Sequence, residues 1–177
     1  MLSILGTTLM FTDHTLDTAP PAARPAMAAV AQRMGGRVPP AVARMANSPE
    51  LLDGFLTLTA AFDRTTLDPL AREVVVMAVA VRHDCHVCVE LHTRKLRALK
   101  AAPELIDALN ADAPLPDDRL EAVRRFVAAV YASAGAVPAY ELADFLSYGF
   151  TERNALEVVM GIGTYTMSTF ANRLTGV

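Results

Sequence analysis

Helix-start signals recur along this sequence, and they constrain its fold more than any other feature. Ser48-Pro49-Glu50 combines a capping side chain, a proline suited to the first helical turn and an acidic residue in that turn. Asp68-Pro69 and Pro116-Asp117-Asp118 repeat the pattern. Since no Asn-Gly or Asp-Gly hairpin signal accompanies these starts, the sequence predicts an all-α fold.

Apolar residues recur at helical spacing between these signals. Leu120, Val123 and Val127, for example, fall on one face of a helix that Pro116 opens and Gly135 stops. The other predicted helices cover residues 20–34, 51–62, 70–82, 103–109, 138–148 and 151–174.

One segment also suits a different secondary structure. The run Val74–Val81 is rich in β-branched residues, as a buried parallel strand would be. A strand there would fit a thioredoxin-like oxidoreductase, but that fold needs further strands, and residues 103–177 read as helices. The cap at Asp68-Pro69 and the length of the segment favour a buried helix.

Composition limits the partners and the location of the protein. At 177 residues the chain is long enough for one domain with its own core. A net charge of -3, spread along the sequence, excludes the basic surface that nucleic-acid binding needs. The high mean hydropathy of +0.29 indicates that some apolar surface is buried between subunits of a homo-oligomer.

The apolar stretches do not predict a membrane protein. Val74–Val81, the longest apolar run, is far shorter than the roughly 20 residues that a membrane-spanning helix requires. The apolar segment Met1–Met10 has no basic residue before it, so we interpret it as an arm laid on a subunit and not as a signal peptide.

The two cysteines stand three positions apart, at Cys85 and Cys88. A pair so close cannot close a long structural loop, which favours a reactive or metal-binding pair in a cytoplasmic protein. Asp84 is predicted to cap the helix that begins at Cys85. On that helix, Cys85, Cys88 and His92 form one stripe.

This stripe suits thiol chemistry. A thiol becomes a good nucleophile only as the thiolate, and both a helix N-terminus and a nearby imidazole favour the thiolate. A second thiol within reach then closes a disulfide, which protects the oxidised sulfur from irreversible oxidation. Such a pair carries two electrons itself, so no bound organic cofactor is expected.

Glu73 is the candidate partner of His92, because it is the only acid between Asp68 and Asp84. A carboxylate bonded to an imidazole fixes its tautomer and makes it a better base. In one continuous helix Glu73 would lie about 120° from the cysteine stripe. The pairing therefore requires a break near residues 82–84 and a returning second helix.

Other functions of the same residues stay open at this point. Cys85, Cys88 and His92 could bind zinc with His83 or His86 as a fourth ligand, although three ligands on one helical stripe make an awkward tetrahedron. Without a metal, we expect His83 and His86 to be exposed residues at a helix start. The pair could also serve a redox or zinc sensor without peroxidase turnover.

Gly161 and Gly163 lie inside an apolar helix, where they indicate a close interhelical or intersubunit contact and not a cofactor site.

Eleven residues separate Glu73 from Cys85-x-x-Cys88, and three residues separate Cys88 from His92. This spacing resembles the signature of the alkylhydroperoxidase D-like branch of the carboxymuconolactone decarboxylase superfamily. Residues 67–99 resemble the core of that family, and residues 170–173 resemble its C-terminal helix. The resemblance implies a single all-α domain over residues 1–177, with its core at about 45–130 and the cysteine pair at the start of a central helix.

The resemblance also implies a mechanism and partners. Cys88 would attack a hydroperoxide, Cys85 would resolve the oxidised sulfur, and His92 with Glu73 would form the proton relay. A dithiol donor, either a lipoylated or a thioredoxin-like protein, would reduce the disulfide, and the subunits would assemble as trimers or hexamers. Some members carry a histidine directly before the second cysteine, where this chain has Val87. Lactone decarboxylation is disfavoured, because the decarboxylases lack the cysteine pair.

Overall fold

The computed structural model describes residues 11–177, so the arm predicted at Met1–Met10 lies outside the described residues. Every regular element in the described part is a helix, which confirms the all-α prediction. The elements are a short 3-10 helix η1 (Pro21–Ala23), α1 (Arg24–Arg33), α2 (Pro40–Met45), α3 (Pro49–Phe62), α4 (Pro69–Arg82), α5 (His86–Ala98), α6 (Pro103–Asn110), α7 (Asp118–Ala132), α8 (Ala139–Ser147) and α9 (Glu152–Thr175).

The predicted caps form at the starts of three helices. Ser48 Oγ accepts a hydrogen bond from the Leu51 amide at 3.3 Å, at the start of α3. Asp68 Oδ1 accepts from Ala71 at 2.9 Å in α4, and Asp117 Oδ1 caps α7 in the same way. Each bond satisfies an amide that the first helical turn leaves without a partner, so local sequence sets where these helices begin.

The chain forms two compact units. The first contains the residues up to Thr57 together with 171–177, and the second contains 58–170. In the first unit, α1 and α2 pack through buried residues that include Met27 and Ala46. Arg44 joins its parts, since its guanidinium binds the Asp13 carboxylate at 2.6 Å and donates to the Thr175 carbonyl.

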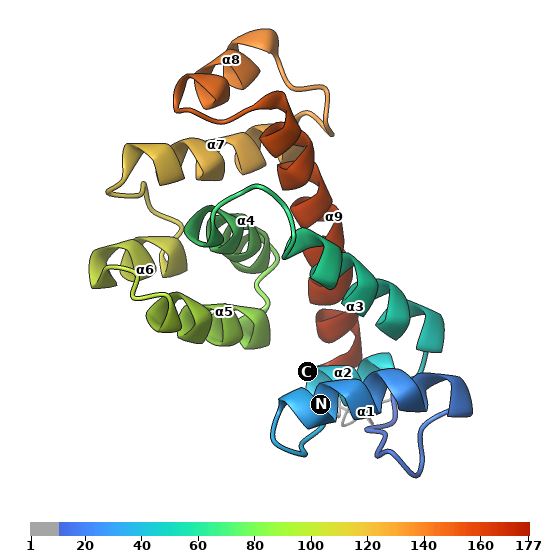
Figure 1. Cartoon of the computed structure of the whole chain (residues 1–177). Helices are drawn as coiled ribbons and strands as arrows, with labels where there is room; N and C mark the ends of the chain where they lie inside the picture. The colour runs from blue at the N-terminus through green and yellow to red at the C-terminus, as the bar shows by residue number, and fades with distance from the viewer. Residues whose placement is uncertain (1–10) are drawn as a thin grey trace, which may run out of the picture. The chain divides into compact units, whose positions relative to one another are not determined.

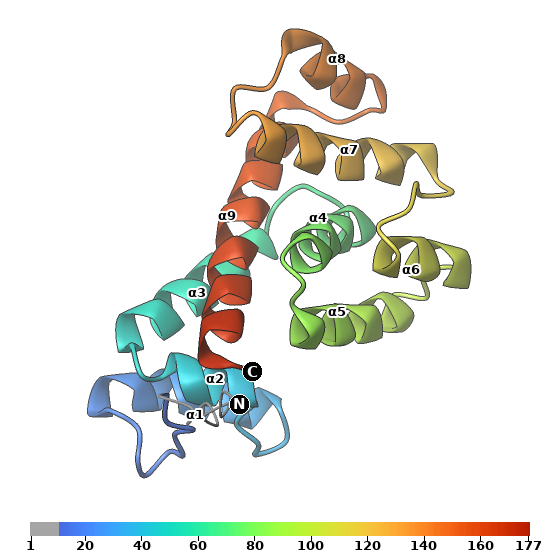
Figure 2. The same ribbon diagram turned by 180° about the vertical axis from the view of Figure 1, so that it is seen from behind.

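Helix α4 is the centre of the second unit, where it packs against α5, α6 and α7 (Figures 1 and 2). Its apolar run is buried on nearly all sides, with Val74, Val75 and Met77 fully covered. The Val74–Val81 segment is therefore the buried helix that its cap and length predict, and the strand interpretation is wrong. A central helix covered in this way can hold a buried polar side chain in a fixed position.

Gly161 of α9 is the place of a close helix contact in this unit. A Cβ built there would lie 2.7 Å from the Phe62 ring and 2.8 Å from Val75, and both of those side chains are buried. The predicted close contact is confirmed at Gly161, although side chains and not a backbone make it. At Gly163, which is exposed, nothing lies within 4 Å of such a Cβ, so no close interhelical contact forms there within the chain, and an intersubunit contact at Gly163 stays a prediction.

Across residues 11–177, no helix is both long and apolar enough to span a membrane.

Candidate active site

A sharp turn between α4 and α5 positions the cysteine pair. His83 follows the last residue of α4, and Asp84 adopts a φ of 51°, a left-handed conformation that aspartate tolerates better than most residues. Helix α4 thus ends within residues 82–84, where the pairing of Glu73 with His92 requires the helix to end. The predicted cap is wrong by one position: Cys85, not Asp84, is the N-cap of α5. The left-handed turn at Asp84 displaces the helix start by one residue.

Both cysteines therefore belong to the N-terminal turn of α5. Cys85 is the N-cap and Cys88 is the third helical residue, where the positive end of the helix dipole favours a thiolate. Both are present as thiols and both are buried, at 2% and 7% exposure. Together with Ala80 they form a small apolar cluster, against which Val87 packs. Only a small group can approach the sulfurs, and Cys88 is the more accessible one.

His92 lies one helical turn after Cys88 and is buried with it. Its Nδ1 is 2.6 Å from Oε2 of Glu73, which α4 supplies. Both side chains are less than a tenth exposed. The returning helix thus makes the contact that residue spacing predicted, and the carboxylate fixes the orientation of the imidazole.

The Glu73 carboxylate is held in its ionised form. Burial alone would raise its pKa, but the hydrogen bond and charge of His92 and the charge of Lys95 outweigh burial and lower the pKa below 4.5. The Lys95 ammonium lies 3.1 Å from Oε1, the oxygen that His92 does not use. Near neutral pH the site therefore contains a buried carboxylate ready to stabilise an imidazolium.

Tyr165 of α9 completes the surroundings of the imidazole. Its ring centroid is 5.4 Å from that of His92, with the rings nearly perpendicular, and Phe62 supports it from another side at 5.8 Å. Burial raises the pKa of the Tyr165 phenol, and the Glu73 and Asp63 carboxylates raise it further. The hydroxyl therefore stays protonated, and the ring limits rotation of the imidazole.

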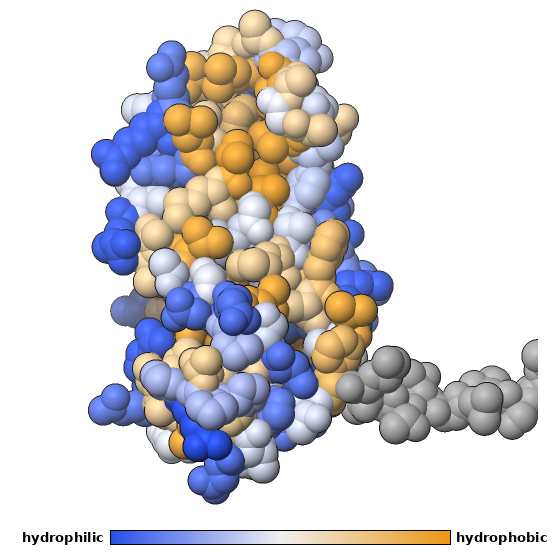
Figure 3. All heavy atoms as spheres, turned by 90° about the vertical axis from the view of Figure 1, so that its right-hand side faces the viewer, coloured by the Kyte–Doolittle hydropathy of each residue, from blue (hydrophilic) through white to orange (hydrophobic). Residues whose placement is uncertain are grey.

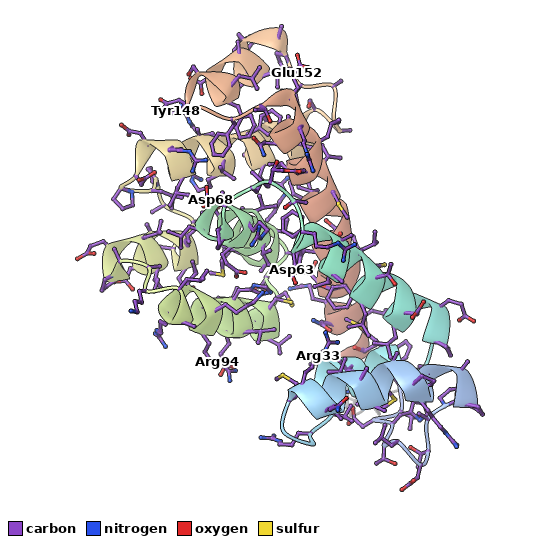
Figure 4. All side chains as sticks on the ribbon, in the orientation of Figure 1. Arg33, Asp63, Asp68, Arg94, Tyr148 and Glu152 are labelled. Atoms are coloured by element: carbon purple, nitrogen blue, oxygen red, sulfur yellow. The ribbon has the colours of Figure 1, made fainter. Side chains whose placement is uncertain are left out.

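A pocket of 320 Å³ reaches the relay at Glu73, and neither cysteine lines it. Figure 4 marks Asp63, which follows α3 and lies at this pocket. The pocket is lined by Asp63, Pro69, Arg72, Glu73, Lys95, Ala98 and Leu99. The carboxylate is thus reached from a side on which the thiols are not exposed.

The two histidines beside the cysteine pair lie apart from this relay. His83 ends α4, where its Nδ1 is 2.9 Å from Thr169 Oγ1, so our interpretation of it as an exposed helix-start residue is wrong. His86 is exposed at the first position of α5, as expected. Among residues 11–177, no group of three or more His, Cys, Asp or Glu side chains is arranged to hold a metal ion. The zinc interpretation therefore gains no support from the geometry.

Sequence reasoning identified Glu73, Cys85, Cys88 and His92 but missed Lys95 and Tyr165. Lys95 follows His92 by three residues, a spacing that places both on one side of a helix, so the sequence did contain a signal for it. Tyr165 lies far along the chain, and no local pattern connects it with the motif.

Comparison with known proteins places this geometry in context. Residues 49–129 match the model of the carboxymuconolactone decarboxylase family. This segment contains α4 and α5 and all four residues of the predicted motif. A comparison with curated proteins gives no match.

Several solved structures share the fold. A peroxidase-related protein with an alkylhydroperoxidase AhpD core from Ralstonia eutropha is 21% identical over 92% of this chain and 87% of that one, with a TM-score of 0.79. A peroxidase-related protein from a Silicibacter species is 20% identical over 99% and 94%, with a TM-score of 0.77. The debrominase Bmp8, solved as a cysteine-to-alanine variant with 2,3,4-tribromopyrrole, is 16% identical over 97% and 91%, with a TM-score of 0.74.

Proposed function

We propose that the chain is a member of the alkylhydroperoxidase D-like branch of the carboxymuconolactone decarboxylase superfamily, and that it is a thiol-dependent peroxidase that reduces hydroperoxides. The 2.6 Å contact between Glu73 and His92, on the helix that begins with two cysteines, carries this proposal. Because His92 lies one helical turn after Cys88, this contact would supply the thiol pair with a base, which purely structural cysteines do not need.

The first step oxidises Cys88. His92 takes the thiol proton, and Glu73 stabilises the resulting imidazolium. The Cys88 thiolate attacks the terminal peroxide oxygen, and the O–O bond breaks. The sulfur becomes a sulfenic acid, and the alkoxide takes the proton from His92 and leaves as an alcohol.

The second step closes the disulfide. The Cys85 sulfur attacks the Cys88 sulfenic acid, and water leaves with the proton of the Cys85 thiol. One hydroperoxide and two thiols thus become one alcohol, one water and one disulfide. A dithiol donor, such as a lipoylated or thioredoxin-like protein, then returns both thiols by exchange and becomes oxidised itself.

Burial of the site favours small or slender organic hydroperoxides. Cys88 is 7% exposed, and its neighbours Ala80 and Val87 are apolar. An alkyl group loses less hydration than a charged one when it enters such surroundings. Bromopyrroles belong in the substrate panel as well, because the debrominase with this fold was solved with one.

We also propose that the protein forms a homo-oligomer, a trimer or hexamer. Light scattering after size-exclusion chromatography measures its mass and tests this. Helix α9 exposes Leu156, Val159 and Phe170, at 73%, 46% and 56% of their surface. Figure 3 shows apolar side chains gathered on one face of the molecule. Apolar surface of this kind is commonly buried between subunits.

The direct test is steady-state consumption of cumene hydroperoxide with dihydrolipoamide as donor. We expect turnover by the unaltered protein and its loss in both Cys88→Ser and Cys85→Ser. Disulfide formation without turnover by any dithiol would instead support a redox sensor. Full turnover by either serine variant would contradict the proposed mechanism.

A further inference from the structure

Both oxygens of the Glu73 carboxylate have a partner on α5. Oε2 is 2.6 Å from His92 Nδ1, and Oε1 is 3.1 Å from Lys95 Nζ. His92 and Lys95 are three residues apart, so one face of α5 supplies both. The carboxylate is therefore fixed at two points and cannot turn away from the imidazole without losing the ammonium.

Lys95 differs from the other members of this cluster in its access to solvent. Its side chain is 45% exposed, whereas those of Glu73 and His92 are 7% and 6% exposed. It lines the 320 Å³ pocket that reaches the carboxylate. A carboxylate buried this deeply loses most of its hydration, so a nearby cation adds to the hydrogen bond of His92 in keeping it charged.

We propose that Lys95 is a positioning residue of this site, whose ammonium holds the Glu73 carboxylate ionised and directed at His92. Lys95 acts through Glu73, lies on the solvent side of the relay and does not touch the substrate. The role of Lys95 in catalysis rests on the proposed peroxidase function, but its effect on Glu73 does not.

Other charged or titratable groups face the same end of the site. Arg72 and Asp63 line the pocket, from α4 and from the segment after α3, and Tyr165 approaches from α9. Arg72 donates to the Leu67 carbonyl at 2.6 Å, so its guanidinium is directed to the backbone. Lys95 is the cation that contacts the carboxylate itself.

Removing the Lys95 ammonium should change the pKa of Glu73 in one direction only. Without Lys95, protonation of Glu73 becomes easier, since a nearby positive charge opposes it. The pH at which Glu73 takes up a proton should therefore rise. Because Lys95 is nearly half exposed and partly screened by water, we expect a shift of about half a pH unit to one unit.

The experiment measures Glu73 directly, by its carboxyl ¹³C resonance as a function of pH in the full-length protein. Glu73→Gln assigns the resonance. Lys95→Met removes the charge and Lys95→Arg keeps it. Arg94→Met is the matched control, because Arg94 (Figure 4) is the neighbouring cation on α5. The Arg94 guanidinium pairs with the Glu90 carboxylate at 2.9 Å and not with Glu73.

We expect a raised Glu73 midpoint in Lys95→Met and near-normal midpoints in Lys95→Arg and Arg94→Met. In the unaltered protein, 1 M salt should move the midpoint in the same direction as Lys95→Met, which tests the pairing without any substitution. A Lys95→Met midpoint within 0.2 units of Arg94→Met, with no salt effect, would overturn the proposal. Absence of peroxidase activity alongside the shift would instead refute the proposed function and leave the role of Lys95 intact.

Discussion

Replacing Glu73 by Gln tests what the buried carboxylate contributes to catalysis. The two side chains have nearly the same shape, so the substitution removes a charge and leaves the packing around α4 almost unchanged. The amide oxygen can still accept from His92 Nδ1, which is 2.6 Å from Oε2 in the unaltered protein. A neutral acceptor, however, stabilises an imidazolium much less than a carboxylate does.

The expected magnitude follows from these hydrogen bonds. A bond to a charged group contributes roughly 1.5–3 kcal/mol, and a neutral one roughly 0.5–1.5 kcal/mol. The difference of about 1–2 kcal/mol applies when Cys88 has lost its proton to His92, the state from which attack proceeds. Since about 1.4 kcal/mol changes a rate tenfold, Glu73→Gln should slow the oxidation of Cys88 roughly 5- to 30-fold.

Stopped-flow measurement of a single turnover isolates this step from reduction by the donor. The observable is the second-order rate constant for loss of the Cys88 thiol in the presence of a hydroperoxide. Glu90→Gln is the matched control, since it removes an acid from the exposed side of the same helix and should leave the rate unchanged. A Glu73→Gln rate within twofold of the unaltered protein would refute the relay.

Two further predictions concern stability. Gly161→Ala should lower the free energy of unfolding by up to about 2 kcal/mol, because overpacking against Phe62 costs about 1–3 kcal/mol and exceeds the helix-propensity gain of about 1 kcal/mol. Gly163→Ala, at an open and exposed position of the same helix, should instead raise it by up to about 1 kcal/mol, and urea unfolding compares the two. Folding lowers the pKa of Glu73, so its carboxylate should contribute its full stabilisation at pH values above 4.5, the usual pKa of a glutamate. That contribution should be lost as the pH falls through the lower pKa of the folded protein. In unfolding curves, the stability difference between the unaltered protein and Glu73→Gln should thus shrink as the pH falls below 4.5, and a difference that grows in acid would contradict the assigned pairing.

The sequence predicted those parts of the fold that local chemistry controls. Ser48, Asp68 and Asp117 each satisfy an unpaired helix-start amide with their own side chain, so the starts of α3, α4 and α7 are encoded within a few residues. Glu73 and His92 could be paired from the sequence, because Glu73 is the only acid between Asp68 and Asp84 and a break near residues 82–84 lets the second helix return to it. The catalytic roles of the two cysteines stay predictions.

Features that depend on distant or subtle contacts escaped the sequence. Helix α2 was missed, since it is only six residues long and has no side-chain cap. The cap of α5 was misplaced because a left-handed residue at Asp84 can be recognised only in three dimensions. Tyr165 reaches His92 through the packing of α9, which no pattern near the motif reports.

The most direct test of the central claim is the stoichiometry of one turnover. One equivalent of cumene hydroperoxide is added to the fully reduced protein, and the products are measured by mass spectrometry and thiol titration. The account predicts one equivalent of alcohol, loss of two thiols and a disulfide between Cys85 and Cys88, with Cys85→Ser arrested at a Cys88 sulfenic acid. Alcohol formation with both thiols retained, or equal oxidation of a Cys88→Ser variant, would contradict it.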